Sequence, residues 1–548
     1  MKRMAGPLVL AVAVVPGIAH AGDFWVDPVH GEPGNDGSAS APWRSLQEIL
    51  DQGLIESRNW ESLPYKEGAR LVPRNAGAPI KAGDTIYLRS GYYGDLRMQG
   101  FYNTKDIAVV AQAGHEPRFR SVRVRASSHW VFRGLSVSPE YAPSYEKATL
   151  FELDSHGWRG PVHDIVVEGC RLQSVEDSSE WSASDWDTLS CSGFRAEGEN
   201  MTIRNNVLRN VNTGIRMEAK NSLVEGNMVE NFAGDGMTGT GDHTTFQYNT
   251  VKNCYDVNEH HDDGFQSFPP READGSRGKR VGIVLRGNTI INYEDPDQPH
   301  RGALQGIGCF GGGYVDFVVE NNVIITDHVH GITITGARNS RIVNNTVFTP
   351  IDGRYGTARV TITAPEDSDR CEGCVVRNNL ASVINIDKTH GVIADHNLII
   401  KSPSKLFVDA AGYDLRPRKG SRAVNAGSPD MAPDIDIEGV PRPWGKGYDI
   451  GAYEYHEGHV DSRPTAKTAQ QSVAAAGDNE DAGVFAGAAD SAQTPVETEA
   501  ETYAADAQKE DAAASAEHHT GFGLGDLRSW GVVLLAATLL LIAWRIGR

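Results

Sequence analysis

Ile-Arg-Asn-Asn-Val-Leu, at residues 203–208, is the first copy of a short pattern that recurs through the middle of the chain. Each copy has one asparagine followed by apolar residues, and these asparagines are Asn206, Asn227, Asn249, Asn288, Asn322, Asn345 and Asn379. The closest copies are 21 to 23 residues apart, which is the length of one coil in a solenoid of short strands. The pattern therefore predicts an all-β fold, a right-handed parallel β-helix.

The same repeat predicts a second column of residues, each placed just before a glycine and an apolar residue. Its members are Thr213, Asp235, Asp263, Gln305 and His330. Neighbouring coils lie roughly 4.8 Å apart, so we expect Asp235 to crowd against the pair Asp262 and Asp263. Carboxylates at such a short separation raise one another's pKa unless a cation neutralises them. Ca2+, which prefers oxygen ligands, is therefore the predicted cofactor.

The two ends of the chain have the composition of an exported, surface-anchored protein. Residues 1–21 combine a basic start, an apolar run and small residues, which is typical of a secretory signal peptide. The net charge is −20, and residues 456–520 carry 13 acidic against 3 basic residues, which predicts a disordered acidic linker. Residues 521–548 contain an apolar run with a basic end, which predicts a transmembrane or sorting tail. Residues 22–455 are left as the folded domain.

Motifs near both ends of this domain resemble known β-helix proteins. Residues 24–28 (Phe-Trp-Val-Asp-Pro) and 82–88 (Ala-Gly-Asp-Thr-Ile-Tyr-Leu) resemble the opening of secreted proteins of the pectate-lyase-like superfamily. Residues 448–454 (Tyr-Asp-Ile-Gly-Ala-Tyr-Glu) resemble a closing module that precedes surface anchors. The resemblance implies that residues 46–54 form an amphipathic N-terminal cap over the first coil.

The run at residues 262–266 (Asp-Asp-Gly-Phe-Gln), one coil after Asp235, resembles the calcium motif of the family 9 polysaccharide lyases. The resemblance implies that Asp235, Asp262, Asp263 and Gln266 bind Ca2+ and that the protein cleaves an acidic glycan by β-elimination. The family places its catalytic lysine in a later Gly-rich step. That step, residues 305–312, contains no lysine in this chain.

Another side chain must then remove the C5 proton of the sugar or bind its carboxylate. The candidates are the cations in and after the insertion that follows Gln266, and two histidines beside the acidic column: Arg271, Lys279, Arg280, Arg301, His261 and His330. A histidine titrates near neutral pH, so it can act as acid or base without a metal.

Three other functions are compatible with the same residues. Asp235 with Asp262 or Asp263 could serve a glycoside hydrolase, which uses two carboxyl groups, and a C5-epimerase would also remove the C5 proton. Trp181 and Trp186 are predicted to stack on sugar rings, although both rings could instead fix their insertion to the solenoid. A surface adhesin that binds carbohydrate without catalysis is the remaining alternative.

We expect a polysaccharide partner and a monomer. We expect no nucleic-acid binding, because basic and aromatic residues do not alternate along the sequence.

Overall fold

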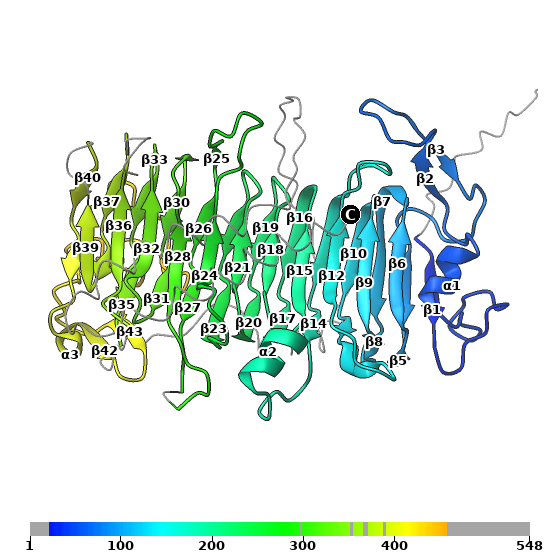
Figure 1. Ribbon diagram of the computed structural model, residues 1–548, viewed down its shortest axis with the longest axis horizontal. Helices are drawn as coiled ribbons and strands as arrows, with labels where there is room; N and C mark the ends of the chain where they lie inside the picture. The colour runs from blue at the N-terminus through cyan, green and yellow to red at the C-terminus, as the bar shows by residue number, and fades with distance from the viewer. Residues whose placement is uncertain (1–20, 296, 351–354, 365–370, 387–390, 458–548) are drawn as a thin grey trace, which may run out of the picture. The chain divides into compact units, whose positions relative to one another are not determined.

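The computed structural model describes residues 21–295, 297–350, 355–364, 371–386 and 391–457 (Figure 1). The predicted signal peptide up to residue 20, the linker from residue 458 and the tail at 521–548 lie outside them. Among the described residues, no helix is long and apolar enough to cross a membrane.

Three long parallel sheets make up the described chain. Sheet I contains β1 (Asp23–Val26), β4 (Thr85–Leu88), β7 (Tyr102–Ala111), β10 (Ser128–Arg133), β13 (His163–Glu168), β16 (Glu199–Arg204), β19 (Leu223–Glu225), β22 (Thr245–Gln247), β26 (Val284–Arg286), β30 (Val318–Glu320), β34 (Arg341–Val343), β37 (Val375–Arg377) and β40 (Ile393–Asp395). Sheet II contains β5 (Gly91–Tyr92), β8 (Pro117–Phe119), β11 (Ser136–Val137), β14 (Arg171–Gln173), β17 (Val207–Val211), β20 (Met228–Phe232), β23 (Thr250–Cys254), β27 (Thr289–Ile291), β31 (Val323–Ile325), β35 (Thr346–Phe348), β38 (Leu380–Ala381) and β41 (Leu398–Ile399). Sheet III contains β6 (Asp95–Gln99), β9 (Ser121–Arg125), β12 (Thr149–Asp154), β15 (Ser192–Ala196), β18 (Ile215–Met217), β21 (Met237–Gly239), β24 (Asp262–Ser267), β28 (Leu304–Cys309), β32 (His330–Thr335), β36 (Arg359–Thr363) and β39 (Val383–Ile386).

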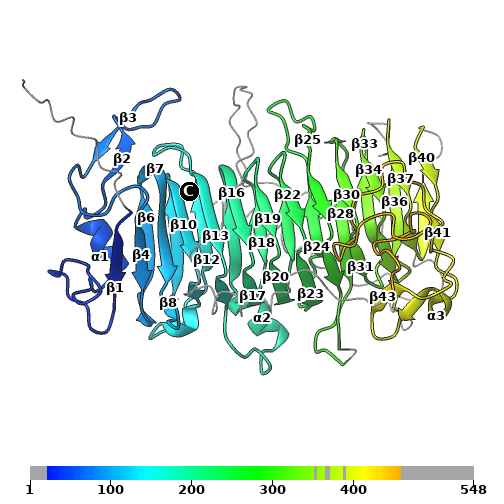
Figure 2. The same ribbon diagram turned by 180° about the vertical axis from the view of Figure 1, so that it is seen from behind.

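Each coil contributes one strand to sheet I, then one to sheet II, then one to sheet III, and successive coils pair in parallel (Figures 1 and 2). This topology confirms the predicted parallel β-helix. The hairpin β2 (Ser57–Trp60) and β3 (Leu71–Arg74) joins sheet I, where β2 pairs antiparallel with β7. The remaining elements are the small sheet of β25 (Arg280–Val281), β29 (Tyr314–Val315) and β33 (Ala337–Arg338), the pair β42 (Phe407–Asp409) and β43 (Asp414–Pro417), and the helices α1 (Leu46–Asp51), α2 (Ala183–Leu189), α3 (Pro403–Leu406) and η1 (Pro139–Tyr141).

Helix α1 lies in the predicted cap segment. Its side chains Leu46, Ile49 and Leu50 are buried in the apolar core between the sheets. The capping role itself stays a prediction.

The recurring asparagines lie in the turns from sheet I to sheet II and form a buried ladder. Nδ2 of each asparagine donates to Oδ1 of the next at 2.9–3.0 Å, from Asn206 as far as Asn397. Each Oδ1 also accepts the backbone N–H of the preceding ladder residue. A register slip would leave these buried amides without partners, so the ladder fixes how the coils stack.

The residue before each ladder asparagine has a left-handed backbone. For example, φ is 55° at Asn205 and 63° at Gly226. Glycine adopts this conformation readily and asparagine tolerates it better than other side chains. The turn geometry therefore explains why most copies of the repeat read Asn-Asn or Gly-Asn; Tyr248 and His396 take the same conformation in the other two turns.

Residues 425–455 fold back onto the outer face of sheet II over the last coils. Ile437, Ile450 and Ala452 share an apolar cluster with outward-facing residues of the coils, among them Val323 and Phe348. This packing explains why both faces of β31 and β35 are buried.

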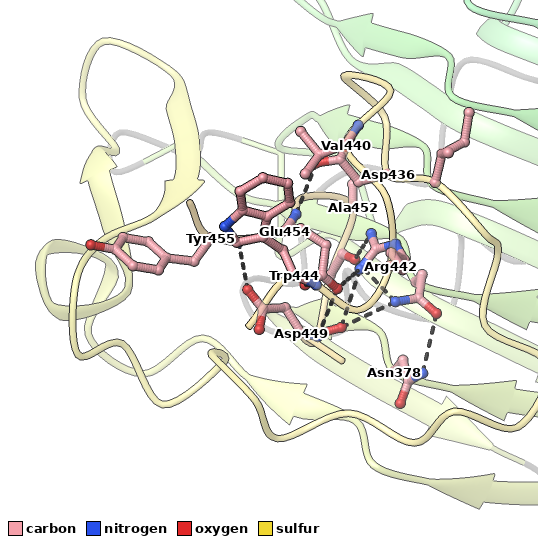
Figure 3. Close-up of polar contacts among 12 residues, drawn as sticks. Asn378, Asp436, Val440, Arg442, Trp444, Asp449, Ala452, Glu454 and Tyr455 are labelled. Atoms are coloured by element: carbon pink, nitrogen blue, oxygen red, sulfur yellow. Dashed lines mark hydrogen bonds and ion pairs between the residues drawn. The ribbon is translucent and has the colours of Figure 1, made fainter. Parts of the chain in front are cut away.

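Polar contacts fix the same segment to the turns between sheets I and II (Figure 3). Arg442 Nη1 donates to Glu454 Oε1 at 2.7 Å, and neither side chain is exposed. Asn344 Nδ2 donates to the carbonyl oxygens of Asp449, at 3.2 Å, and Gly451, at 3.3 Å. The motif at 448–454 thus supplies buried groups that bind the side of the solenoid.

Candidate active site

The predicted column of polar residues lies along one line of sheet III. The apolar residues that follow its glycines pair in register: Met237 with Phe265, Phe265 with Ile307, and Ile307 with Ile332. Asp263 itself pairs with Gln305. The register that the sequence predicted is confirmed, and it places Asp235, Asp263, Gln305 and His330 on successive coils.

Asp263 and His261 form the closest acid and base contact of this column. His261 Nδ1 lies 2.8 Å from Asp263 Oδ2, and the Asp263 side chain is fully buried whereas that of His261 is 24% exposed. Gln266 Nε2 donates to the same carboxylate oxygen at 3.1 Å. An ionised carboxylate can only accept a hydrogen bond, so His261 Nδ1 donates to Asp263, and in the neutral imidazole the lone pair is then on Nε2. This tautomer suits a general base at Nε2.

Asp235 lies one coil before Asp263 and contacts its backbone. Asp235 Oδ1 accepts the Asp263 N–H at 3.3 Å, and Oδ2 accepts the Thr238 hydroxyl at 3.0 Å. Burial raises the pKa of the Asp235 carboxyl, and the Thr238 hydrogen bond and the charge on His261 oppose part of that rise. Asp235 can therefore hold a proton at a higher pH than an ordinary aspartate.

Asp262 points the other way, into the core. It pairs in register with the buried Leu304, and Cys254 Sγ donates to Asp262 Oδ2 at 3.2 Å. Burial raises the pKa of Asp262 well above its usual range, and nearby carboxylates add to that rise. Asp262 therefore faces the core and does not join Asp235 and Asp263 on the outer face as predicted.

The predicted calcium ligands do not fit a Ca2+ ion as a set. Asp262 faces the core, and Gln266 directs its amide nitrogen at Asp263. Among the described residues, no cluster of three or more His, Cys, Asp or Glu side chains has the arrangement of a metal site. Ca2+ binding requires several oxygen atoms around one point, so the column offers Asp235 and Asp263 but not the full predicted set.

Gln305 and Gly308 shape the next coil. The buried Oε1 of Gln305 has no hydrogen-bond partner among the described residues. A Cβ at Gly308 would lie 2.4 Å from Asp263 Oδ1 and 3.3 Å from Gln305 Oε1. The glycine is therefore needed for these two oxygen atoms to lie over the strand, at the step where the family resemblance expects a lysine.

His330 lies in the same column with a second histidine, His328, which the sequence reasoning missed. His330 Nδ1 lies 3.0 Å from the Thr333 hydroxyl, and its ring packs edge-on against Phe310. Burial lowers the pKa of His328 to about 4, and the charge on His261 adds to that effect. His328 is therefore neutral at neutral pH and lies close enough to His261 to sense its protonation.

Arg301 lies in the turn that leads into β28, at the same edge of sheet III as His261. Its guanidinium carbon lies 3.5 Å from the centre of the Tyr293 ring. Nη2 donates to Tyr293 Oη at 2.5 Å and lies 3.7 Å from the buried Asp327 carboxylate. The structure thus fixes Arg301 within a buried cluster one coil beyond Asp263.

The other predicted cations lie at the opposite edge of the sheet. Sheet III strands begin at the α2 edge and end at the β25 edge, which are the lower and upper edges in Figure 1. Arg271, Lys279 and Arg280 follow the end of β24, whereas Asp263 lies near its start. Arg280 pairs with Asp242 at 3.2 Å, and Arg271 and Lys279 are exposed. The structure does not bring these three cations to the acidic column, because their insertion leaves from the wrong end of the strand.

The two tryptophans belong to the α2 insertion. Trp186 is fully buried, and its ring stacks on Tyr255 at 4.4 Å between centroids. Trp181 packs edge-on against Trp186 at 5.2 Å. Trp186 offers no face to a sugar in this position, which corrects its predicted stacking role and agrees with the alternative that it fixes the insertion. Trp181 is half-buried, and its predicted role stays a prediction.

Arg195 and Arg216 are polar residues of this face that the sequence reasoning did not single out. They pair in register with each other, and Arg216 pairs with Thr238. Both follow the same glycine and apolar step that marks the column, one position after the apolar residue. The repeat could therefore have predicted that both arginines lie on the outer face, because the residues on either side of an inward-facing residue point outward.

Comparisons with known proteins leave the family unassigned. No protein-family model matches the chain, and no curated protein matches it. Among solved structures it is similar to the pectate lyase Pel9A, with 15% identity, a TM-score of 0.42, and 80% of this chain and 98% of that chain covered. It is also similar to the A-module of the Azotobacter vinelandii mannuronan C-5 epimerase AlgE4 (16% identity, TM-score 0.32, 57% and 88% covered). A third is XylC in complex with xylose (9% identity, TM-score 0.40, 78% and 98% covered). The strand pairing of the three sheets defines the fold.

Proposed function

We propose that this protein is an exported enzyme that acts on a polysaccharide, and that His261 and Asp263 are its central acid and base groups. The observation that carries the proposal is the 2.8 Å contact between His261 Nδ1 and the buried Asp263 carboxylate on the face of sheet III. A buried carboxylate orients the imidazole and stabilises its charged form. Such a pair is costly to keep in a protein that only binds sugar, because Asp263 is desolvated.

The reaction that these groups support best is β-elimination in a uronate polymer. His261 Nε2 takes the proton from C5, the electrons of that C–H bond form the C4=C5 double bond, and the C4–O bond breaks. Asp235, whose pKa is raised by burial, is the candidate donor of the proton to the leaving oxygen. Arg216, one coil before, is the candidate group that neutralises the sugar carboxylate and makes the C5 proton more acidic.

A calcium-dependent lyase is the alternative that the motif at 262–266 predicts. In that case Asp235 and Asp263 would supply part of the oxygen ligands, together with groups other than Asp262. A chelator should then abolish turnover and lower Tm, because a ligand that binds only the native protein stabilises it. If His261 and Asp263 act without a metal, dialysis against a chelator leaves both turnover and Tm unchanged. Calorimetric titration with CaCl2 distinguishes the two.

A glycoside hydrolase that uses Asp235 and Asp263 is the second candidate function. The observation that favours it is their position on adjacent coils with the pKa of Asp235 raised, since a hydrolase needs one protonated and one ionised carboxyl group. Its product would have a new reducing end without a double bond. A C5-epimerase would produce neither a cleaved chain nor a double bond, and it would exchange the C5 proton with solvent.

The test is turnover on a panel of uronate and neutral polysaccharides, followed by ultraviolet absorbance of the unsaturated product, by reducing ends, and by deuterium incorporation. His261→Gln should lower kcat by about a hundredfold or more, the usual scale for a general base. His396→Asn is the matched control, because His396 makes a similar 3.0 Å contact with Asp395 but lies half-exposed on another turn. Full activity of His261→Gln refutes the assignment, and no turnover of any substrate by the native protein favours the adhesin.

A further inference from the structure

The outer face of sheet III carries a line of arginine side chains on one side of the candidate site. The register aligns the following residues on successive coils from β6 to β18: Arg97, Arg123, Glu152, Arg195 and Arg216. The same line continues through uncharged residues from β21 to β39: Thr238, Gln266, Gly308, Thr333, Thr361 and Asn385. The line therefore changes from arginines, interrupted by Glu152, which contacts Arg123 at 3.0 Å, to uncharged residues at the coil that holds Asp235. We call Arg123, Arg195 and Arg216 the arginine column.

Carboxylates lie beneath the arginine column and hold it in place. Arg123 contacts Asp154 at 2.6 Å, Arg195 contacts Glu197 at 2.9 Å, and Arg216 pairs with Glu218. The three arginine side chains are 35–42% exposed, whereas these carboxylate side chains are 11–24% exposed. The guanidinium groups thus form the surface that solvent meets, and the carboxylates form the layer below.

Ion pairs of this kind also occur on the other sheets, as Arg204 with Glu168 on sheet I and Arg209 with Glu230 on sheet II. Position distinguishes the arginine column from them. Arg216 pairs in register with Thr238, whose hydroxyl donates to Asp235 at 3.0 Å. The charge of Arg216 also acts on the Asp235 carboxyl. The arginine column therefore runs directly into the candidate site.

We propose that the arginine column binds the anionic groups of a polyuronate chain that lies along the solenoid axis, on the N-terminal side of His261 and Asp263. The proposal rests on the proposed function only for the place of the chemistry, and it specifies the substrate class and the side of the site that its charged part occupies. The uncharged side of the line, beyond Gln266, would hold the other part of the chain through hydroxyl and amide contacts.

The chemistry of the guanidinium group fits this ligand. Its planar set of N–H donors matches a carboxylate in a bidentate geometry. Arg195 and Arg216 lie on neighbouring coils, roughly 4.8 Å apart, and Arg123 lies two coils before Arg195, so a flexible chain can engage several of them. Because the carboxylates below already fix the arginines, little side-chain freedom is lost on binding. Nucleic acid is the competing polyanion, and it would also use stacking on aromatic side chains, which the line from Arg97 to Asn385 does not contain.

The experiment measures binding rather than turnover, in the His261→Gln background so that the ligand survives. The probes are oligogalacturonate, the same oligomer with its carboxyl groups reduced to alcohols, and single-stranded DNA. Arg195→Gln should weaken oligogalacturonate binding about tenfold or more, as expected for loss of a charged hydrogen bond, and should reduce the salt dependence of Kd. Arg209→Gln is the matched control, because Arg209 is 49% exposed over Glu230 on sheet II. Its Kd should be unchanged.

Arg195→Lys guards against a variant that fails to fold. It keeps the charge over Glu197 and Glu218 but loses the planar donor set, so its Tm should equal that of the parent while its Kd rises severalfold. Equal binding by Arg195→Gln, Arg195→Lys and Arg209→Gln overturns the proposal, as does equally tight binding of the reduced oligomer or of DNA. If the binding pattern holds but the native protein turns over no uronate, the proposed enzyme function fails alone. If uronate is turned over and the arginine variants bind normally, the arginine column fails alone.

Discussion

Replacing Asn322 by alanine should show how much the asparagine ladder contributes to stability. Nδ2 of Asn322 donates to the Leu285 carbonyl at 2.8 Å and to Asn345 Oδ1 at 2.9 Å. Its Oδ1 accepts the backbone N–H of Asn288 at 2.9 Å and the Asn288 amide at 3.0 Å. The variant loses all four contacts at a site with no exposed surface.

The losses are unequal, which sets the expected magnitude. Asn345 Oδ1 still accepts the Asn322 backbone N–H, and Asn288 Nδ2 still donates to the Phe246 carbonyl. The backbone N–H of Asn288 loses its acceptor, Asn322 Oδ1, and stays buried. A net hydrogen bond contributes about 1 kcal/mol and an unsatisfied buried donor costs about 1–3 kcal/mol, so we expect a loss of about 4 kcal/mol in the free energy of unfolding.

The assay is urea unfolding followed by circular dichroism, with the slope compared between variants so that a change of midpoint reports stability. Asn397→Ala is the matched control. Asn397 makes the same kinds of contact, to Asn379 at 2.9 and 3.0 Å and to the Val376 carbonyl at 2.8 Å, but it is half-buried. Water can replace its hydrogen bonds, so a loss of about 1 kcal/mol is expected. Equal losses at both positions, or less than about 1 kcal/mol at Asn322, would refute this account of the ladder.

Three further predictions concern pH, catalysis and the α2 insertion. Burial raises the pKa of Asp449 to about 6 from 3.8, so the folded protein binds this proton at a higher pH than the unfolded chain does. Protonation therefore stabilises the folded protein by at most about 3 kcal/mol; the contribution grows as the pH falls from about 6 to about 4 and is lost above pH 6. Asp449→Asn should lack that part of the pH dependence in thermal melts, and an unchanged profile would contradict the prediction. Gly308→Ala should lower kcat by about tenfold or more, because the new Cβ would lie 2.4 Å from Asp263 Oδ1 and must push that oxygen aside; normal turnover would show that this oxygen need not lie there. Trp186→Ala should lower the free energy of unfolding by about 3–5 kcal/mol, since the buried ring leaves a cavity beside Tyr255, while KM stays constant in folded protein; a raised KM with unchanged stability would restore the sugar-stacking role.

The sequence predicted the solenoid because its repeat has a physical cause at every copy. A left-handed backbone position followed by a buried amide favours Asn-Asn or Gly-Asn, although Tyr248 and His396 adopt the same backbone before Asn249 and Asn397. The same regularity placed Asp235 next to Asp263. The position of His261 beside Asp263 followed from their separation of two residues.

Other parts of the site followed rules that the sequence reasoning did not apply or could not apply. Adjacent residues in a strand point to opposite faces, so Asp262 and Asp263 could not both face outward. The cations of the insertion after Gln266 could not be placed, because a loop of that length has no periodicity to define its direction. The packing of residues 425–455 on sheet II was likewise invisible, since it depends on contacts such as Asn344 with Asp449 that are far apart in sequence.

The position of the closing segment decides how the solenoid would face its surroundings. Tyr455 and Glu454 are held by Asp449 and Arg442 at the edge shared by sheets I and II, which is the edge opposite sheet III in a three-sided coil. The described chain ends two residues later, at Glu457. The described chain therefore leaves the solenoid on the side that faces away from His261. A polymer that lies across the coils of sheet III would not meet the closing segment.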